Sequence, residues 1–239
     1  MLTDKFLLKR RRDRLSAEAL GALEDALTDV RVVPARQKLV EEDETVTLST
    51  YLVHGFLCRY VDGRGGQRQL VAIHIPGDFV DLHSFPLERI DHQVATMTDV
   101  TIASVRHDAL NGLMARHPAL VRSLWFSTML DAAISREWIF RLGNLPAIGR
   151  VAHFFCELGT RLSIVDLGEG STFALPLTQM DVADACGLSS EHVNRVLRQL
   201  REAQILLFAD GRLIMQDWDK AKSIAQFDQG YLYVDGVTD

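Results

Sequence analysis

The side chains best suited to chemistry lie close together near the C-terminal end of the chain. Glu191, Asn194, Arg195 and Arg198 recur at intervals of three and four residues, which places them on one side of a helix that turns about 100° per residue. A guanidinium can donate two parallel hydrogen bonds, a carboxylate accepts them, and an amide does both. These groups can read the edges of base pairs, so the pattern indicates contact with DNA.

The residues around this helix predict how it is positioned. Thr178 and Asp181 have the spacing of a capping box, which begins a first short helix. Gly187 can end that helix in a left-handed conformation without a steric penalty, and Ser189 is the expected N-cap of the second helix. The apolar side of the second helix consists of Val193, Val196, Leu197 and Leu200. Two short helices joined by a glycine turn predict a helix-turn-helix.

An alternative stays open at this point. A charged helix face is common, so the same stretch fits an ordinary helical hairpin with a solvated surface. The formal net charge of −6 also differs from that of a non-specific nucleic-acid binder, which is usually basic. Positive charge is local, in residues 9–14 and at Arg195, Arg198 and Arg201. Any contact with DNA is therefore confined to a small surface, and the run at 9–14 is either a DNA-contacting arm or the solvated start of a helix.

The sequence pattern of the N-terminal half predicts a β domain that follows a helix. Residues 1–29 have apolar side chains at helical spacing, which predicts a helix. From 30 to about 105, short segments rich in β-branched and aromatic residues alternate with turn sequences such as Asp62-Gly63 and Pro76-Gly77-Asp78. Short strands at this spacing predict a small antiparallel barrel or roll.

A long helix is predicted to follow the roll. After a short helix near 107–115, residues 119–142 are apolar around much of the helix circumference. A helix with one wet face does not need so many apolar positions, so we expect one side to pack on the roll and another on a second copy of the chain. A helix buried inside a monomer is the alternative. Residues 143–146 contain Gly143 and Pro146, which predict a break and a hinge.

The C-terminal part completes the predicted architecture. A helix at 147–162 precedes the helix-turn-helix, and residues 205–215 form a hairpin about Asp210-Gly211, as in a winged helix. A helix at 218–227 and a strand-like tail, YLYV, end the chain. The predicted fold class is α+β, with an antiparallel β-roll, a long dimerisation helix and a winged helix-turn-helix. The predicted domains are 1–118, 119–142, a hinge at 143–146, and 147–239.

Composition narrows the function classes. With 47% hydrophobic and 24% charged residues, the chain is typical of a soluble globular protein. No apolar run is long enough for a membrane span, and no secretory signal is evident. Three cysteines without close spacing argue against a disulfide scaffold and favour the cytoplasm. We find no glycine-rich phosphate loop between a strand and a helix, no nucleophile elbow and no metal-ligand run, so an enzyme is not expected.

Three motifs carry a family resemblance. PGDF at 76–79, GNLPAIGRVA at 143–152 and the helix-turn-helix occur in this order, and the chain resembles the Crp/Fnr family of bacterial transcription regulators over nearly its whole length. The resemblance implies a homodimer with a β-roll that senses a signal, a long dimerising helix and a winged helix that enters the major groove of DNA. RNA polymerase is an implied partner if the protein is an activator. A winged-helix signalling module that binds protein rather than DNA is the remaining alternative.

The resemblance also implies roles for individual residues. Glu191, Asn194 and Arg195 match the base-contacting positions. The expected phosphate contacts are Thr178, Gln179, Ser189, Ser190, His192 and Arg198. The Crp branch has an Arg where Ser190 stands here, so the recognition helix is closer to the Fnr branch, which reads palindromes of TTGAT-like half-sites. Asn194 replaces a Ser of that branch and could alter the preferred base.

The resemblance does not identify an effector. Cyclic-nucleotide-binding members have a Gly-Glu pair after the PGD turn and an Arg followed by a hydroxyl residue; here PGDF continues as Val80-Asp81-Leu82-His83, without that pair, and Ile90 follows Arg89. Cyclic AMP is therefore not expected. An Fnr-type iron–sulfur cluster is excluded, because the N-terminal region has no cysteine. Haem is a weaker alternative, with His54, Cys58, His74, His83 or His92 as axial ligands. Oxidation of Cys186 is another, although a buried structural cysteine is the favoured interpretation.

Overall fold

The computed structural model describes residues 1–236. The chain forms two compact units: residues 1–61 with 72–132, and residues 62–71 with those from 133 onward. The first unit contains most of the predicted roll. The second contains the winged helix together with the tip of a hairpin from the roll, a pairing that the predicted domain ranges did not include.

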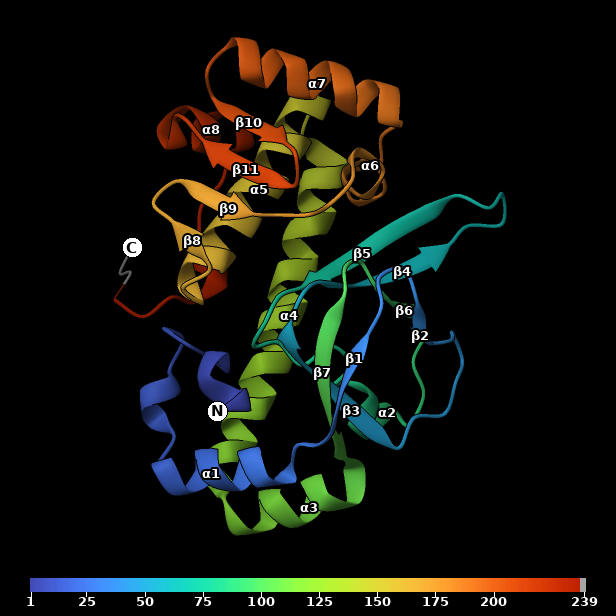
Figure 1. Cartoon of the computed structure of the whole chain (residues 1–239), viewed down its shortest axis with the longest axis vertical. Helices are drawn as coiled ribbons and strands as arrows, with labels where there is room; N and C mark the ends of the chain where they lie inside the picture. Colours follow the sequence, from blue (N-terminus) through green and yellow to red (C-terminus); the bar gives the residue numbers. More distant parts are fainter. Residues whose placement is uncertain (237–239) are drawn as a thin grey trace. The chain divides into compact units, whose positions relative to one another are not determined.

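The first unit is built on two sheets (Figure 1). In one, β1 (Thr28–Val33), β7 (Val100–Arg106) and β3 (Leu48–His54) pair antiparallel in that order. In the other, the order is β2 (Lys38–Val40), β6 (Gln93–Thr96), β4 (Leu57–Asp62) and β5 (Arg68–His74). The predicted antiparallel roll is confirmed. The sequence did not reveal β2 and β6, which are short and, in the case of β6, buried at every position.

The predicted helix over residues 1–29 is wrong for its first half. Only α1 (Ala17–Ala26) is α-helical, and the Ser16 side chain caps it by accepting a hydrogen bond from the Ala19 amide at 3.1 Å. Before it lie two 3-10 turns, Leu2–Lys5 and Arg12–Arg14. Between them Leu7, Lys9 and Arg11 have φ values of 49°, 53° and 63°. Three left-handed residues at alternate positions are incompatible with an α-helix.

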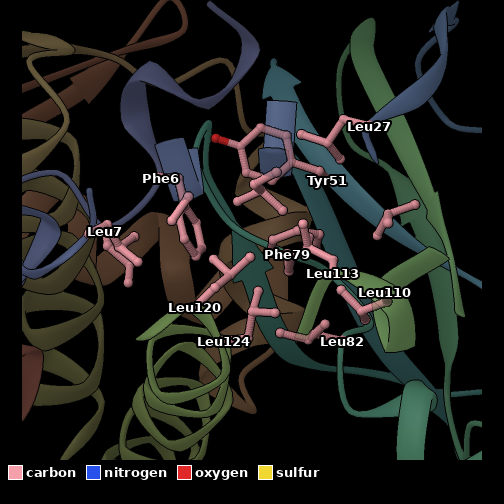
Figure 2. Close-up of a cluster of buried hydrophobic side chains, with 14 of the residues drawn as sticks. Phe6, Leu7, Leu27, Tyr51, Phe79, Leu82, Leu110, Leu113, Leu120 and Leu124 are labelled. Atoms are coloured by element: carbon pink, nitrogen blue, oxygen red, sulfur yellow. The ribbon is translucent and has the colours of Figure 1, made fainter. Parts of the chain in front are cut away.

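Tertiary contacts hold this N-terminal segment in place. Phe6 and Leu7 are buried in an apolar cluster with Leu23 and Leu27 of the α1 region, Tyr51 and Phe79 of the roll, Leu110 and Leu113 of α3 (His107–Arg116), and Leu120 and Leu124 of the next helix. Figure 2 shows Phe6 and Leu7 projecting towards the same interior as Leu120 and Leu124. Burial of two large apolar side chains outweighs the propensity of residues 1–16 to form a helix.

Two helices follow α3. The long helix α4 spans Pro118–Asn144, and α5 spans Ala147–Ile164. The predicted interruption at 143–146 is narrower than expected, because Gly143 and Asn144 belong to α4 and only residues 145 and 146 separate the two helices. Pro146 is the N-cap of α5, where a missing amide hydrogen has no cost. A short helix, α2 (Ser84–Leu87), lies in the roll. Over residues 1–236 we find no helix of the length and hydropathy needed to span a bilayer.

The second unit has the predicted winged-helix elements. α6 (Gln179–Cys186) and α7 (Ser190–Glu202) precede the hairpin of β10 (Leu206–Ala209) and β11 (Arg212–Met215). β9 (Thr172–Ala174) and β8 (Gly168–Glu169) complete a sheet in the order β10-β11-β9-β8, and α8 (Trp218–Ala225) follows (Figure 1).

The predicted strand-like tail is wrong. Gly230–Leu232 is a 3-10 turn, and Tyr233 has a left-handed φ of 51°. The Tyr231 hydroxyl donates to Oε2 of the buried Glu157 at 3.0 Å, and the Trp138 indole N–H also donates to this carboxylate, at 3.1 Å. A buried carboxylate requires such donors. The tail therefore adopts a turn that brings the Tyr231 hydroxyl to Glu157.

Candidate nucleic-acid interface

Local capping positions the two helices of the helix-turn-helix, as the sequence predicts. The Thr178 hydroxyl accepts from the Asp181 amide at 3.1 Å, while the Asp181 carboxylate accepts from the Thr178 amide at 2.8 Å. Gly187 has a φ of 62° and ends α6. The Ser189 hydroxyl accepts from the His192 amide at 3.2 Å and begins α7. The predicted capping box, glycine turn and second cap are all confirmed.

The two faces of α7 divide as predicted. Val193, Val196, Leu197 and Leu200 are buried against the unit. Glu191, Asn194, Arg195 and Arg198 are exposed on the opposite side. A carboxylate, an amide and two guanidinium groups are thus presented together on a helix whose orientation its apolar face fixes. This arrangement can donate to guanine and accept from cytosine in a major groove.

Two hydrogen bonds connect the exposed ends of α6 and α7. Asn194 donates through Nδ2 to Gln179 Oε1 at 3.2 Å, and the Ser190 hydroxyl donates to the sulfur of Met180 at 3.3 Å. The structure therefore brings Gln179, a predicted phosphate contact, beside Asn194, a predicted base contact. Met180, which sequence reasoning did not single out, is exposed at the same place.

Thr178 has a different local role from the other predicted phosphate contacts. Its hydroxyl hydrogen is donated to Asp181 Oδ2 at 2.8 Å. A hydroxyl has one hydrogen, so Thr178 caps α6 and has no hydrogen left for a phosphate in this conformation. Of the others, Ser189 and Arg198 are exposed, and His192 is partly exposed.

Two arginines that sequence reasoning missed anchor the C-terminal end of α6. Arg141 of α4 is fully buried and donates through Nη2 to the Ala185 carbonyl at 3.0 Å, with its guanidinium 3.9 Å from the centre of the Trp138 ring. Arg150 of α5 donates through Nη1 to the Cys186 carbonyl at 3.5 Å. The last carbonyls of a helix lack partners within the helix and favour cations. An arginine within an otherwise apolar helical pattern is the signal that could have indicated Arg141.

The hairpin tip at residues 62–71 contributes one further contact. Gln69 donates through Nε2 to the Asp184 carbonyl of α6 at 2.6 Å. A residue of β5, one of the predicted strands of the roll, thus hydrogen-bonds to the first helix of the helix-turn-helix. No sequence spacing indicates this pairing, because the two residues are 115 positions apart.

The interior of the roll contains a cluster of polar side chains. Arg59 of β4 forms an ion pair with Asp131 of α4. The distance from Arg59 Nη1 to His83 Nδ1 is 3.5 Å. The rings of His83 and His92 have centroids 5.1 Å apart. Among the described residues, Nε2 of His74, of His83 and of His92 is buried and has no hydrogen-bond partner. Burial, together with the positive charge of Arg59, lowers the pKa of His83 to about 4.

These residues do not fit a cyclic nucleotide. Arg89, the arginine near the expected phosphate position, is exposed and pairs with Asp43 at 3.2 Å. Asp81, in the stretch after PGDF that lacks the Gly-Glu pair, is fully buried and accepts from the Thr50 amide at 2.6 Å, and burial raises its pKa to about 6. A carboxyl group at this place disfavours an anionic phosphate.

The candidate haem ligands among the histidines lie in different environments. His54 is exposed, whereas His74, His83 and His92 lie around the Arg59–Asp131 ion pair. Within the described residues, no group of three or more His, Cys, Asp or Glu side chains could hold a metal ion. A macrocycle that displaced Asp131 would leave the buried Arg59 without its ion-pair partner, which is costly.

All three cysteines lie in the described part of the chain, and each is buried. Burial raises the pKa of Cys186 to about 11, and its thiol contacts the Arg150 carbonyl at 3.8 Å. A reactive thiol needs exposure and a low pKa. The favoured interpretation of Cys186 as a structural residue is consistent with this environment.

Two family models match the chain. Residues 30–117 match the cyclic nucleotide-binding domain, and residues 149–222 match the Crp-like helix-turn-helix domain. The first range covers the roll up to α3, and the second covers α5 to α8. The order of the two domains along the chain is the order that the sequence predicted.

Curated relatives and solved structures agree with these matches. The transcriptional activator protein FnrL of Cereibacter sphaeroides is 26% identical over 86% of this chain and 83% of its own length. The transcriptional activatory protein AadR of Rhodopseudomonas palustris is 29% identical over 74% of this chain and 73% of its own. The structure of FixK2 from Bradyrhizobium japonicum superposes with a TM-score of 0.73 at 23% identity, covering 83% of this chain and 97% of FixK2. With its sensor-type roll, long helix and capped helix-turn-helix, the chain belongs to the Crp/Fnr family of transcription regulators.

Proposed function

We propose that the protein regulates transcription as a homodimer that reads a palindromic operator with Glu191, Asn194 and Arg195. The observation that carries this proposal is the exposed polar face of α7, opposite four buried aliphatic residues. Two such helices related by a two-fold axis would enter major grooves roughly 34 Å apart. TTGAT-like half-sites follow from the likeness of this helix to the Fnr branch.

The roles of the individual side chains follow from their chemistry. Arg195 is suited to donate two hydrogen bonds to guanine, and Glu191 to accept from the cytosine amino group. Asn194 is held by Gln179 at 3.2 Å, so the pair would approach DNA together. Gln179, Ser189, Ser190, His192 and Arg198 would contact phosphates and fix the register. Thr178 would act through the helix cap.

Dimerisation would use the exposed apolar side of α4. Trp125, Met129 and Ile139 are 66%, 48% and 71% exposed. They lie four and ten residues apart, which keeps them on one side of a helix that turns about 100° per residue. Apolar side chains exposed along a helix at this spacing are typical of a helix–helix interface. RNA polymerase is the further partner if the protein is an activator, and the cytoplasm is the compartment that fits both partners and three cysteines without close spacing.

Arg195→Ala tests base reading. Binding sites are first selected from random DNA with the wild-type protein, and affinities for the selected duplex and for a scrambled duplex are then measured at one salt concentration. Loss of a bidentate contact costs about 1–3 kcal/mol, so we expect the affinity for the selected duplex to fall about 5- to 150-fold per half-site, with little change for the scrambled one.

The control is Arg201→Ala, which removes the same charge from the last turn of α7. Because the N-terminal part of a recognition helix contacts base edges, this variant should keep the selected sequence preference. If Arg195→Ala also keeps it, Arg195 does not read a base, and a winged helix that binds protein becomes the better account.

A further inference from the structure

The first unit contains a cavity of about 430 Å³ between the N-terminal segment and the beginning of α4. The segment contributes Leu7, Arg11 and Arg14 to its lining, and α4 contributes Arg122, Ser123 and Phe126. The cavity is separate from the helix-turn-helix and from the interior cluster around Arg59. Its volume is within the range of small-molecule sites.

The lining has a strong excess of positive charge. Three guanidinium groups border the cavity, and across residues 1–236 no acidic side chain lines it. The chain as a whole has a formal net charge of −6, so this concentration of arginine runs against the overall balance. Like charges that share a concave surface repel one another unless an anion lies between them. Arginine is also the side chain best shaped to bind phosphate or carboxylate oxygens in pairs.

The cavity also has an aromatic surface. The guanidinium carbon of Arg11 lies 4.5 Å from the centre of the Phe126 ring. This cation–π contact places one guanidinium against the ring, and Leu7 lines the same cavity. A ligand that complements these groups has acidic oxygens at one end and an apolar or aromatic body at the other. Inorganic phosphate alone would not complement the apolar part of this lining.

Several contacts preform this site. The Glu24 carboxylate accepts from the amides of Leu2 and Thr3 at 2.5 and 2.9 Å, and from the Thr3 hydroxyl at 2.8 Å. Arg12 donates through Nη1 to the carbonyls of Thr3 and Phe6, both at 2.7 Å. Phe6 and Leu7 are also anchored in the apolar cluster, as Figure 2 shows. These contacts hold Leu7 and Arg11 in the left-handed conformation, which is costly for residues other than glycine.

We propose that this cavity binds a small organic anion that carries at least two acidic groups on an aromatic or apolar body, the chemistry of a nucleoside phosphate. Arg14 and Arg122 bind the acidic oxygens, and Arg11 and Phe126 contact the body. The site does not depend on base reading by Arg195, so each can fail without the other.

Binding is measured by calorimetric titration of the full chain with ADP, and with pyrophosphate as a probe that lacks the body. We expect ADP to bind more tightly than pyrophosphate. In the double variant Arg14→Ala/Arg122→Ala, ADP affinity should fall at least about 10-fold, since two charge-assisted contacts are lost. Phe126→Leu keeps the volume roughly constant and should weaken ADP but not pyrophosphate.

The matched control is Arg116→Ala, which removes an exposed arginine from α3 in the same unit but outside the cavity. It should leave ADP affinity unchanged. The proposal is overturned if ADP does not bind, if it binds the double variant as tightly as the wild type, or if Arg116→Ala weakens it equally. Equal affinity for pyrophosphate and ADP would remove the aromatic body from the proposal. Displacement of ADP by a short non-specific duplex would assign the arginines to DNA phosphates instead.

Discussion

At the scale of single residues, burial controls the charge states of the ionisable side chains inside the roll. Arg59 is 6% exposed and pairs with Asp131, which reaches it from α4. His83 and His92 pack beside this pair, and burial lowers the pKa of each. The distance from His74 Nδ1 to Asp78 Oδ2 is 3.7 Å, and burial likewise lowers the pKa of His74. The histidines are therefore held neutral next to a permanent positive charge.

We expect acid to destabilise the fold through His83. Its pKa falls from 6.5 to about 4 on folding, so between these values the unfolded chain binds more protons than the native one. The free energy of unfolding should therefore decrease as the pH falls through this window. One pKa unit corresponds to about 1.4 kcal/mol, so the loss between about pH 7.5 and about pH 5 is roughly 2 kcal/mol.

Urea unfolding of the wild type and of His83→Asn at both pH values measures this effect. Asp81, whose pKa burial raises to about 6, acts in the opposite direction, and it is present in both proteins. The wild type should lose roughly 2 kcal/mol more than His83→Asn on acidification. Equal losses would mean that His83 titrates normally in the folded roll.

At the scale of elements, the PGDF turn has a role that its motif does not reveal. Gly77 has a φ of 103°, and a Cβ placed on it would lie 2.5 Å from the Lys5 carbonyl oxygen. The turn therefore packs directly against the backbone of the N-terminal segment, whose next residues are the buried Phe6 and Leu7. The Gly77 amide also donates to the Leu52 carbonyl at 2.8 Å. The glycine is needed both for its backbone conformation and for this close approach.

Gly77→Ala should destabilise the protein by more than the backbone strain alone. The control is Gly66→Ala, because Gly66 has a φ of 78° but a Cβ placed on it would have no atom of another residue within 4 Å, its chain neighbours aside. Strain of this kind costs on the order of 1–3 kcal/mol. We expect the free energy of unfolding to fall more in Gly77→Ala than in Gly66→Ala. Hydrogen exchange in residues 1–11 should also become faster in Gly77→Ala. Equal losses and unchanged exchange would show that the contact with Lys5 is dispensable.

At the scale of the whole molecule, the exposed apolar side of α4 determines assembly in the proposed function. Ile139 is 71% exposed and Val32, on the edge strand β1, is 72% exposed. Exposure alone therefore does not distinguish them. Only Ile139 belongs to the helical series with Trp125 and Met129, which is why α4 rather than β1 is the proposed interface.

Ile139→Asp should weaken dimerisation, and Val32→Asp should not. Each dimer loses two aliphatic side chains and gains two charges at the interface, so we expect the dissociation constant to rise at least about 10-fold. Sedimentation velocity over a range of protein concentrations measures it. A wild-type chain that stays monomeric at all concentrations would refute the proposed interface, and a larger effect of Val32→Asp would move the interface to β1.

The sequence by itself determined the features that depend on neighbours in the chain. The capping box of Thr178 and Asp181, the turn at Gly187 and the two faces of α7 follow from spacing alone, because capping and helical periodicity are local. The hairpin about Asp210-Gly211 and most strands of the roll were predicted for the same reason. The assignment of Glu191, Asn194 and Arg195 to bases rests on the family resemblance and stays a prediction.

Only the tertiary structure decided the features that depend on residues far apart in sequence. The left-handed segment at Leu7 to Arg11 exists because Phe6 and Leu7 reach a core formed by four other regions of the chain. Arg141 and Gln69 hydrogen-bond to carbonyls of α6, and Tyr231 donates to Glu157. Each of these contacts satisfies a buried or terminal polar group whose partner the linear sequence does not specify. For that reason the α7 surface was found from the sequence, while the arginine cavity was not.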